Sequence, residues 1–191
     1  MKPRKSLEII DIIGDVVKAT SEDCRIIPYN CDGVQTEISC PPINYIFGNP
    51  TYWKDRLDEM SKTPTGNEMK MPLIALNCPF TEDRTDPKYY TQSKVWLIIA
   101  CSTLQQWSNE QRRLYSFGNV LTPIYDKFIE TLREDRRLDF GYRPLVRHLK
   151  SENYSFGRYG AVTPSGDEVS EPIDAIIISN LEIKVKSPNC R

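Results

Sequence analysis

The chain has 191 residues, of which 39% are hydrophobic and 27% are charged. This length and composition predict one globular domain with a full hydrophobic core and exclude a disordered or fibrous chain. Its 25 Lys and Arg residues nearly balance its 26 Asp and Glu residues, so no long-range field steers it onto nucleic acid or an anionic membrane. The longest apolar runs, such as residues 95–101, are far shorter than the roughly 20 residues that cross a bilayer.

The first 40 residues predict a helix followed by strands. Ser6 is a typical helix cap. The apolar residues after it recur at helical spacing, which indicates one buried face: Ile9, Ile12, Ile13 and Val16. Acidic residues interrupt this stripe, so it is not expected to be a secretory signal. Residues 24–47 change to the pattern of strands, with alternation at residues 34–39 and a second run at residues 43–47.

A short helix, a loop and two strands are predicted next. Asn49 and Pro50 form a typical helix start, with the asparagine as cap and the proline in the first turn. Residues 61–71 have the polar composition of a loop, and residues 72–78 follow as a strand. The continuous apolar run at residues 95–101 is typical of a central strand that is covered on both faces.

Residues 79–92, which connect these two strands, allow two interpretations. The segment is rich in charge, proline and tyrosine, which fits a solvated hairpin connection. It also fits an extended arm that packs on a neighbouring molecule, because amphipathic aromatic side chains are enriched at interfaces. Its candidate interface residues are Phe80, Arg84, Tyr89 and Tyr90.

A long amphipathic helix is predicted to cover the sheet. Ser108 and Gln111 match a capping box, in which each side chain bonds the backbone of the other residue. The stripe predicted to be buried repeats at steps of three and four residues: Leu114, Phe117, Leu121, Ile124, Phe128 and Leu132. Pro123 lacks a backbone N–H, so we expect a kink at residues 118–122 or two helices that meet there.

The last part of the chain is predicted to be a loop and a strand. Glycine and proline recur through residues 139–170, which indicates a long, loosely structured excursion. β-Branched residues dominate residues 172–186, so this segment is predicted to be a long final strand, bent near Ser179 and Asn180.

The residue types that carry chemistry do not form a recognisable catalytic or metal site. Cys101 lies at a strand-to-helix junction, but nothing places the only histidine, His148, beside it as a base, so we interpret Cys101 as a packing thiol. Asp174 is an isolated carboxylate. No C-x-x-C pair occurs among the six cysteines, which are expected to stay reduced: Cys24, Cys31, Cys40, Cys78, Cys101 and Cys190. We therefore expect no cofactor, no metal and no enzymatic activity.

The one concentration of positive charge, residues 132–150, leaves three interpretations open. Its candidate contact residues are Arg136, Arg137, Tyr142, Arg143 and Arg147. Cations near the C-terminus of a helix are favoured by the helix dipole, so a solvated helix end explains them. They also fit contact with an acidic protein surface or with a phosphate backbone.

Three segments are the most distinctive parts of the sequence: PLIAL at residues 72–76, the spacing R-x-x-x-F-x-x-V-L-x-P-I-Y from Arg113, and DAIIISNLEIKV at residues 174–185. With the order of the predicted elements, they resemble the tail-completion and tail-terminator-like neck proteins of tailed bacteriophages, as in crAss-like phages. The resemblance covers residues 40–186 and includes no catalytic motif.

The resemblance implies an α+β fold in which a single, mostly antiparallel or mixed sheet packs against helices, with long loop extensions. The whole chain is expected to be one domain, with an N-terminal extension at residues 1–40, a core at residues 41–186 and a tail at residues 187–191. The extension is expected to dock on a neighbouring ring, and the alternative is that it adds a helix and a strand pair to the core.

The function that the resemblance implies is that of a structural virion protein in the head–tail connector. Such a protein forms a ring of six or twelve copies around the DNA channel and joins portal-side to tail-side components. Its partners would be its own copies, portal or adaptor rings and tail proteins, with DNA only as channel content and no membrane. It would be assembled in the host cytoplasm and reside in the virion.

From the residues alone, two other classes stay open: a nucleic-acid-binding accessory protein and a small cytosolic enzyme without a recognisable motif. The nucleic-acid class predicts that Arg136, Arg137, Arg143 and Arg147 share one exposed face. The enzyme class predicts convergent polar residues in a pocket, whereas the assembly class predicts apolar and aromatic patches at subunit edges.

Overall fold

The computed structural model describes residues 6–30, 35–142, 145–159 and 171–188. Its helices are α1 (Ile9–Asp23), α2 (Pro50–Met60), α3 (Pro64–Met69), α4 (Asn109–Arg112), the π-helix η1 (Arg113–Leu121) and α5 (Thr122–Glu134). Its strands are β1 (Arg25–Ile26), β2 (Ile38–Ser39), β3 (Asn44–Gly48), β4 (Leu73–Asn77), β5 (Glu82–Asp83), β6 (Tyr89–Ser102), β7 (Leu149–Tyr159) and β8 (Glu171–Lys186). Within this part of the chain, none of the helices has the length and apolar character that a membrane span requires.

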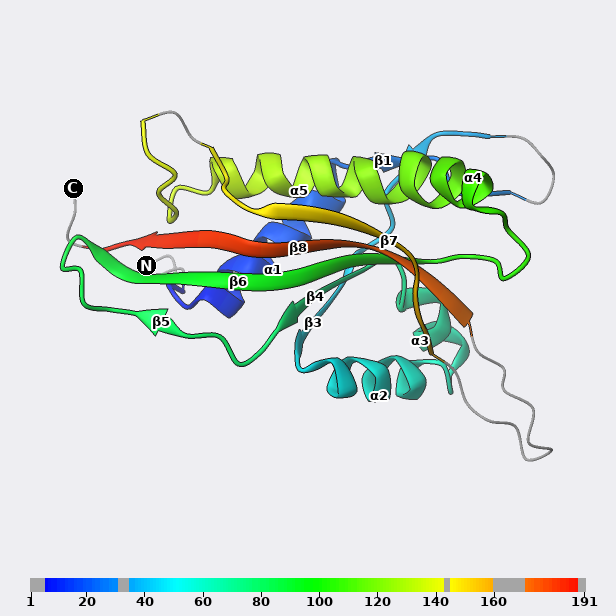
Figure 1. Ribbon diagram of the computed structural model, residues 1–191, viewed down its shortest axis with the longest axis horizontal. Helices are drawn as coiled ribbons and strands as arrows, with labels where there is room; N and C mark the ends of the chain where they lie inside the picture. The colour runs from blue at the N-terminus through cyan, green and yellow to red at the C-terminus, as the bar shows by residue number, and fades with distance from the viewer. Residues whose placement is uncertain (1–5, 31–34, 143–144, 160–170, 189–191) are drawn as a thin grey trace.

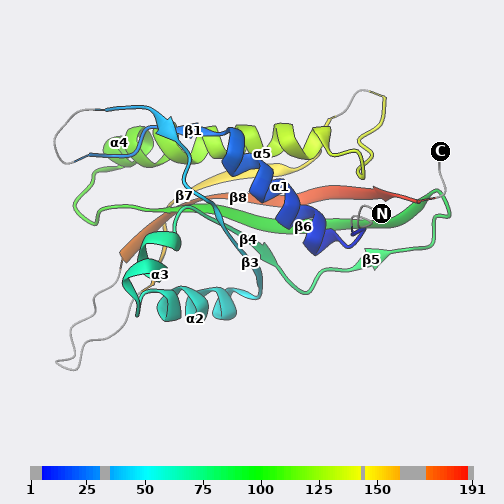
Figure 2. The same ribbon diagram turned by 180° about the vertical axis from the view of Figure 1, so that it is seen from behind.

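The elements form three layers around a large sheet with the strand order β3-β4-β6-β8-β7. α1 and the continuous α4–η1–α5 helix cover one face, whereas α2 and α3 lie against the other (Figures 1 and 2). β3 and β4 run parallel, and the other contacts, including that of β5 with β6, are antiparallel. The predicted α+β fold class, with a mostly antiparallel, mixed sheet packed against helices, is confirmed.

The strands β6 and β8 are central, and β3 and β7 are the two edges of the sheet among the described residues. The predicted central strand at residues 95–101 lies inside β6. It is buried along nearly its whole length, because β4 and β8 flank it and helices cover both faces.

β8 bends where the sequence predicted a bend. Asn180 has a left-handed φ of 54°, a conformation that asparagine tolerates better than most residues. Val95 pairs with Leu181 and Leu97 pairs with Ile178, so β8 uses one more residue than β6 between these two pairs. This bulge keeps alternate side chains of both halves of β8 on the face that α1 and α5 cover.

Two hydrophobic cores lie on the two faces of the sheet. The larger core joins the sheet to α1 and α5 and includes Ile12, Leu97 and Phe128, so the N-terminal helix is part of the core of this fold. The smaller core lies under α2 around Trp53 and Leu57. α2 covers only one half of its face (Figure 1), and alternate residues on the other half are polar: Gln92, Lys94, Glu182 and Lys184.

The predicted capping box at Ser108 and Gln111 is confirmed, with both reciprocal hydrogen bonds present. After α4 the backbone has π-helical bonding through nine residues and returns to α-helical bonding at Thr122. Pro123 therefore enters where the hydrogen-bond ladder changes register, so its missing N–H leaves the helix unbroken. A π-helix and an α-helix therefore meet at this point, which confirms the prediction that two helices meet there. The two helices run in the same direction (Figure 1).

Leu114 is the one residue of the predicted buried stripe that lies outside the core, with half of its surface exposed. The other five residues of the stripe are buried. A π-helical turn contains more residues than an α-helical turn. It therefore shifts Leu114 out of the angular position that a regular α-helix would give it.

Three further sequence predictions were wrong. Residues 61–71 contain α3, whose start at Thr63 and Pro64 repeats the cap-and-proline signal of α2. Residues 139–170 contain β7, an edge strand with few apolar residues because much of it is exposed; residues 160–170 lie outside the described residues. Of the alternation predicted at residues 34–39, residue 34 lies outside the described residues, and residues 35–39 contain only the two-residue β2, which is exposed and pairs with β1.

Candidate assembly surface

Cys101 is confirmed as a packing thiol in the core. Burial, with a smaller contribution from the negative charge of Asp174, raises the pKa of the Cys101 thiol to about 12. His148 is engaged elsewhere: its Nε2 lies 2.7 Å from the Tyr125 hydroxyl, and its Nδ1 lies 2.8 Å from the Val146 carbonyl oxygen. A thiol that stays protonated and sealed from solvent is a poor nucleophile.

Asp174, which looked isolated in the sequence, forms a buried ion pair with Arg112. Arg112 Nη1 donates to Asp174 Oδ1 at 2.8 Å, and the Ser155 backbone N–H donates to the same oxygen at 2.9 Å. The guanidinium also donates to the carbonyls of Leu104 and Trp107. The pair therefore fixes the start of the long helix on β8, and both side chains are almost completely buried.

The described cysteines are free thiols: Cys24, Cys40, Cys78 and Cys101. Cys31 and Cys190 lie outside the described residues. Among the described residues, no three His, Cys, Asp or Glu side chains are grouped so that they could hold a metal ion.

Residues 79–92 form a connection that folds back on the chain itself. β5 pairs with β6 within this segment, and Phe80 packs against the larger core. Arg84 binds Glu82 and the Tyr90 hydroxyl, and Tyr90 donates to Glu8 at 2.8 Å. Three of the candidate interface residues, Phe80, Arg84 and Tyr90, therefore have intramolecular contacts with the core or near the start of α1.

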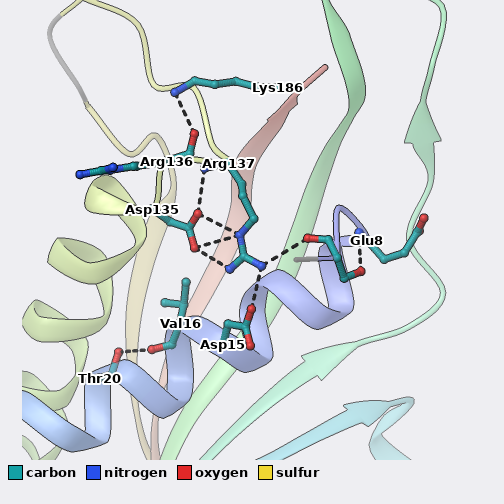
Figure 3. Close-up of polar contacts among 9 residues, drawn as sticks. Glu8, Asp15, Val16, Thr20, Asp135, Arg136, Arg137 and Lys186 are labelled. Carbon is teal, nitrogen blue, oxygen red and sulfur yellow. Dashed lines mark hydrogen bonds and ion pairs between the residues drawn. The ribbon is translucent and has the colours of Figure 1, made fainter. Parts of the chain in front are cut away.

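Arg137 holds the turn after α5 against α1 (Figure 3). Its guanidinium donates to both oxygens of Asp135 and to Asp15 at 2.7 Å. Hydrogen bonds to Asp135, supplemented by the one to Asp15, raise the pKa of Arg137 above its ordinary value. The Arg136 guanidinium points away from this network (Figure 3). The backbone carbonyl of Arg136 accepts a hydrogen bond from Lys186 Nζ.

The chain beyond Arg137 runs beside the last part of β8. The Asp139 N–H donates to the Lys184 carbonyl at 2.9 Å, and the Glu182 N–H donates to the Arg147 carbonyl at 3.0 Å. The Asp139 carboxylate accepts from the Gly141 N–H and from the Tyr89 hydroxyl, which lowers the pKa of Asp139. The segment therefore extends the sheet beyond the start of β7.

This segment exposes three large apolar side chains, which we call the apolar trio: Tyr142, Leu145 and Leu149. They are 101%, 67% and 59% exposed, respectively, and they are the three most exposed large apolar side chains of the described residues. Leu149 is the first residue of edge strand β7. The trio therefore lies beside a row of backbone groups that another strand can pair with.

A cavity of about 230 Å³ lies next to the apolar trio, between the start of β6, residues 139–141, Leu145, Arg147 and the last part of β8. We call it the basic pocket because three cations line it: Lys88, Arg147 and Lys184. Two carboxylates, Asp139 and Glu182, also line it. The ammonium groups of Lys88 and Lys184 lie 5.2 and 5.6 Å from the centre of the Tyr89 ring.

The structure brings Tyr89 and Arg147 together at the basic pocket, with Tyr142 close along the chain. It does not bring Phe80, Arg84, Tyr90 or Arg137 there, because these side chains have contacts near α1 or in the core. Arg143 lies outside the described residues. The sequence analysis did not identify Leu145, Leu149 and Lys184 as residues of this surface. Period-two alternation could have indicated them, because the apolar Val146 is buried between the exposed Leu145 and Arg147.

Comparisons with protein-family models, with curated proteins and with solved structures found no match to this chain.

Proposed function

We propose that this protein is a structural subunit of the head–tail connector of a tailed bacteriophage, in which copies join into a ring of six or twelve around the DNA channel. The observation that supports it most is the apolar trio beside the open edge of β7. Exposed apolar side chains of this size at a strand edge are unfavourable in water and favour association with another protein surface.

The two edges of the sheet differ, which suits a ring rather than a symmetric dimer. β7 is an eleven-residue edge strand that begins at the apolar trio, whereas β3 at the opposite edge has five residues and exposes Phe47. A contact between two different surfaces of identical subunits is heterologous, and it closes into a ring when the rotation between subunits allows it. The α+β architecture itself also agrees with the fold that the sequence resemblance implies.

The experiment that tests this proposal compares assembly of two variants. Leu145→Lys together with Leu149→Lys places charges in the apolar trio, which lies at the surface, so the fold should be retained. Leu114→Lys is the matched control, because Leu114 is also an exposed leucine but lies near the α4 end of the long helix. Sedimentation velocity at matched concentrations reports the size of each species.

We expect the wild type and Leu114→Lys to form the same closed oligomer and the double variant to sediment as a monomer with unchanged circular dichroism. If the double variant forms the same oligomer as the wild type, the apolar trio is not the assembly surface. Electron microscopy of the source particle, with antibodies against the protein, tests the connector location separately: labelling of the capsid shell or of host debris alone would contradict it.

A further inference from the structure

We infer that the basic pocket binds carboxylate side chains from an acidic, partly apolar segment of another protein in the assembly. This inference rests on the proposed function and adds the chemistry of the partner. The pocket adjoins the apolar trio and is partly formed by Leu145, so one docked segment can contact both.

The charges of the pocket do not cancel internally. The Asp139 carboxylate is already bound by the Tyr89 hydroxyl at 3.0 Å and the Gly141 N–H at 2.9 Å. Glu182 faces Lys94, with 3.6 Å between the ammonium and carboxylate groups. Within the described part of the chain, neither Arg147 nor Lys184 forms an ion pair, although both line the cavity. These two cations are therefore available to an anion from outside.

The size of the cavity favours side chains over a cofactor. Small-molecule sites typically enclose roughly 300–1,000 Å³, and this cavity has about 230 Å³. Arginine binds a carboxylate through two parallel hydrogen bonds, and a nearby ammonium adds a second positive charge. One or two acidic side chains therefore match the available donors.

The surroundings favour a protein segment over a nucleic acid. A phosphate backbone that bound the cations of the pocket would leave Leu145 and the other residues of the apolar trio exposed, because phosphates and sugars offer little apolar surface. An acidic segment that includes leucines satisfies both the cations and the apolar side chains.

The test is fluorescence anisotropy with a fluorescein-labelled synthetic peptide of glutamate and leucine residues. The first comparison is a peptide in which glutamine replaces every glutamate, and the second is a single-stranded DNA oligonucleotide of equal net charge. The pocket variant is Arg147→Gln with Lys184→Gln. The control is Arg133→Gln, because Arg133 is an exposed cation on α5 that does not line this pocket.

We expect the wild type to bind the acidic peptide at least roughly tenfold more tightly than the glutamine peptide, since charge-assisted hydrogen bonds are lost in the latter. The pocket variant should lose a similar factor, and Arg133→Gln should bind like the wild type. Equal binding by the pocket variant and the wild type would overturn the inference, as would tighter binding of the oligonucleotide than of the acidic peptide.

The outcome separates this inference from the proposed function. The wild type could bind the acidic peptide through Arg147 and Lys184 but stay monomeric and be absent from particles. This result would contradict the proposed ring and support the inferred binding at the basic pocket. The wild type could instead form the ring but show no preference for the acidic peptide. This result would contradict the inferred binding at the basic pocket and support the proposed ring.

Discussion

The charged side chains near the two ends of β8 differ in whether they have a partner within the protein. Near the start of the strand, Asp174 is paired with Arg112 and sealed beneath the long helix. Near its end, Lys184 and Arg147 line a cavity and stay unpaired among the described residues. A buried ion pair fixes one arrangement of the fold, whereas an unpaired cation beside exposed leucines is available to another molecule. The comparison separates charges that hold this protein together from charges that suit binding.

The largest effect is expected from breaking the sealed pair. Arg112→Met leaves the Asp174 carboxylate buried without its cation, and removal of one partner of a buried pair costs about 3–5 kcal/mol of folding free energy. Urea unfolding at neutral pH measures the change. Arg113→Met, at the exposed neighbouring position, should change the stability by less than about 0.5 kcal/mol. Equal effects of the two changes would mean that the pair does not anchor the helix.

The next effect concerns the thiol beside Asp174. Because the pKa of Cys101 is about 12 in the fold and about 8.5 in an unfolded chain, the unfolded state releases this proton first as pH rises. The stability contributed by Cys101 is therefore full below about pH 8.5 and falls above it, by roughly 1–2 kcal/mol near pH 10. Urea unfolding of the wild type and Cys101→Ala from pH 8 to pH 10 should show a shallower decline for the variant. If the stability of the wild type and of Cys101→Ala declined in parallel, this would contradict the raised pKa of Cys101.

A smaller effect is expected at Arg137, which is engaged like Arg112 but lies nearer the surface. Arg137→Met removes the donors that hold Asp135 and Asp15, and we expect a loss of about 1–2 kcal/mol. Arg136→Met changes a guanidinium that points away from the network (Figure 3), so its effect should be within about 0.5 kcal/mol. Thermal unfolding of the two variants makes the comparison. A larger loss of stability for Arg136→Met would contradict the role of Arg137 in holding the turn after α5 against α1.

The smallest effect on folding is expected at the open end of β8. Arg147→Gln with Lys184→Gln removes two charges that make no ion pair in the described structure. The free energy of unfolding should therefore change by less than about 0.5 kcal/mol, or increase slightly through reduced repulsion. A loss of stability as large as that of Arg112→Met would show that these cations stabilise the fold, which would contradict the expectation that they bind a partner.

Local signals in the sequence predicted much of the fold. Asn49 with Pro50 and Ser108 with Gln111 each specify a helix start through contacts within a few residues, and both were confirmed. Thr63 with Pro64 has the same kind of signal and was overlooked. Leu114 was misplaced because a π-helical segment changes the periodicity on which the prediction rests.

The candidate surface was only partly predictable, because it depends on contacts between distant parts of the chain. Tyr89 and Arg147 were identified from residue type, but no local pattern indicates that they share a cavity with Lys184. Arg137 has the residue type of an interface cation, yet Asp15, far away in sequence, engages it. The partner of Asp174 was likewise hidden, since Arg112 lies on a helix that reaches β8 only in the folded protein.

The mass of the native wild-type assembly tests the central claim most directly. Light scattering on the purified protein across a wide concentration range, together with imaging of the source particle, measures it. We predict a closed ring of six or twelve copies that is found at the virion neck. A monomer at every concentration that is absent from any particle would contradict the account.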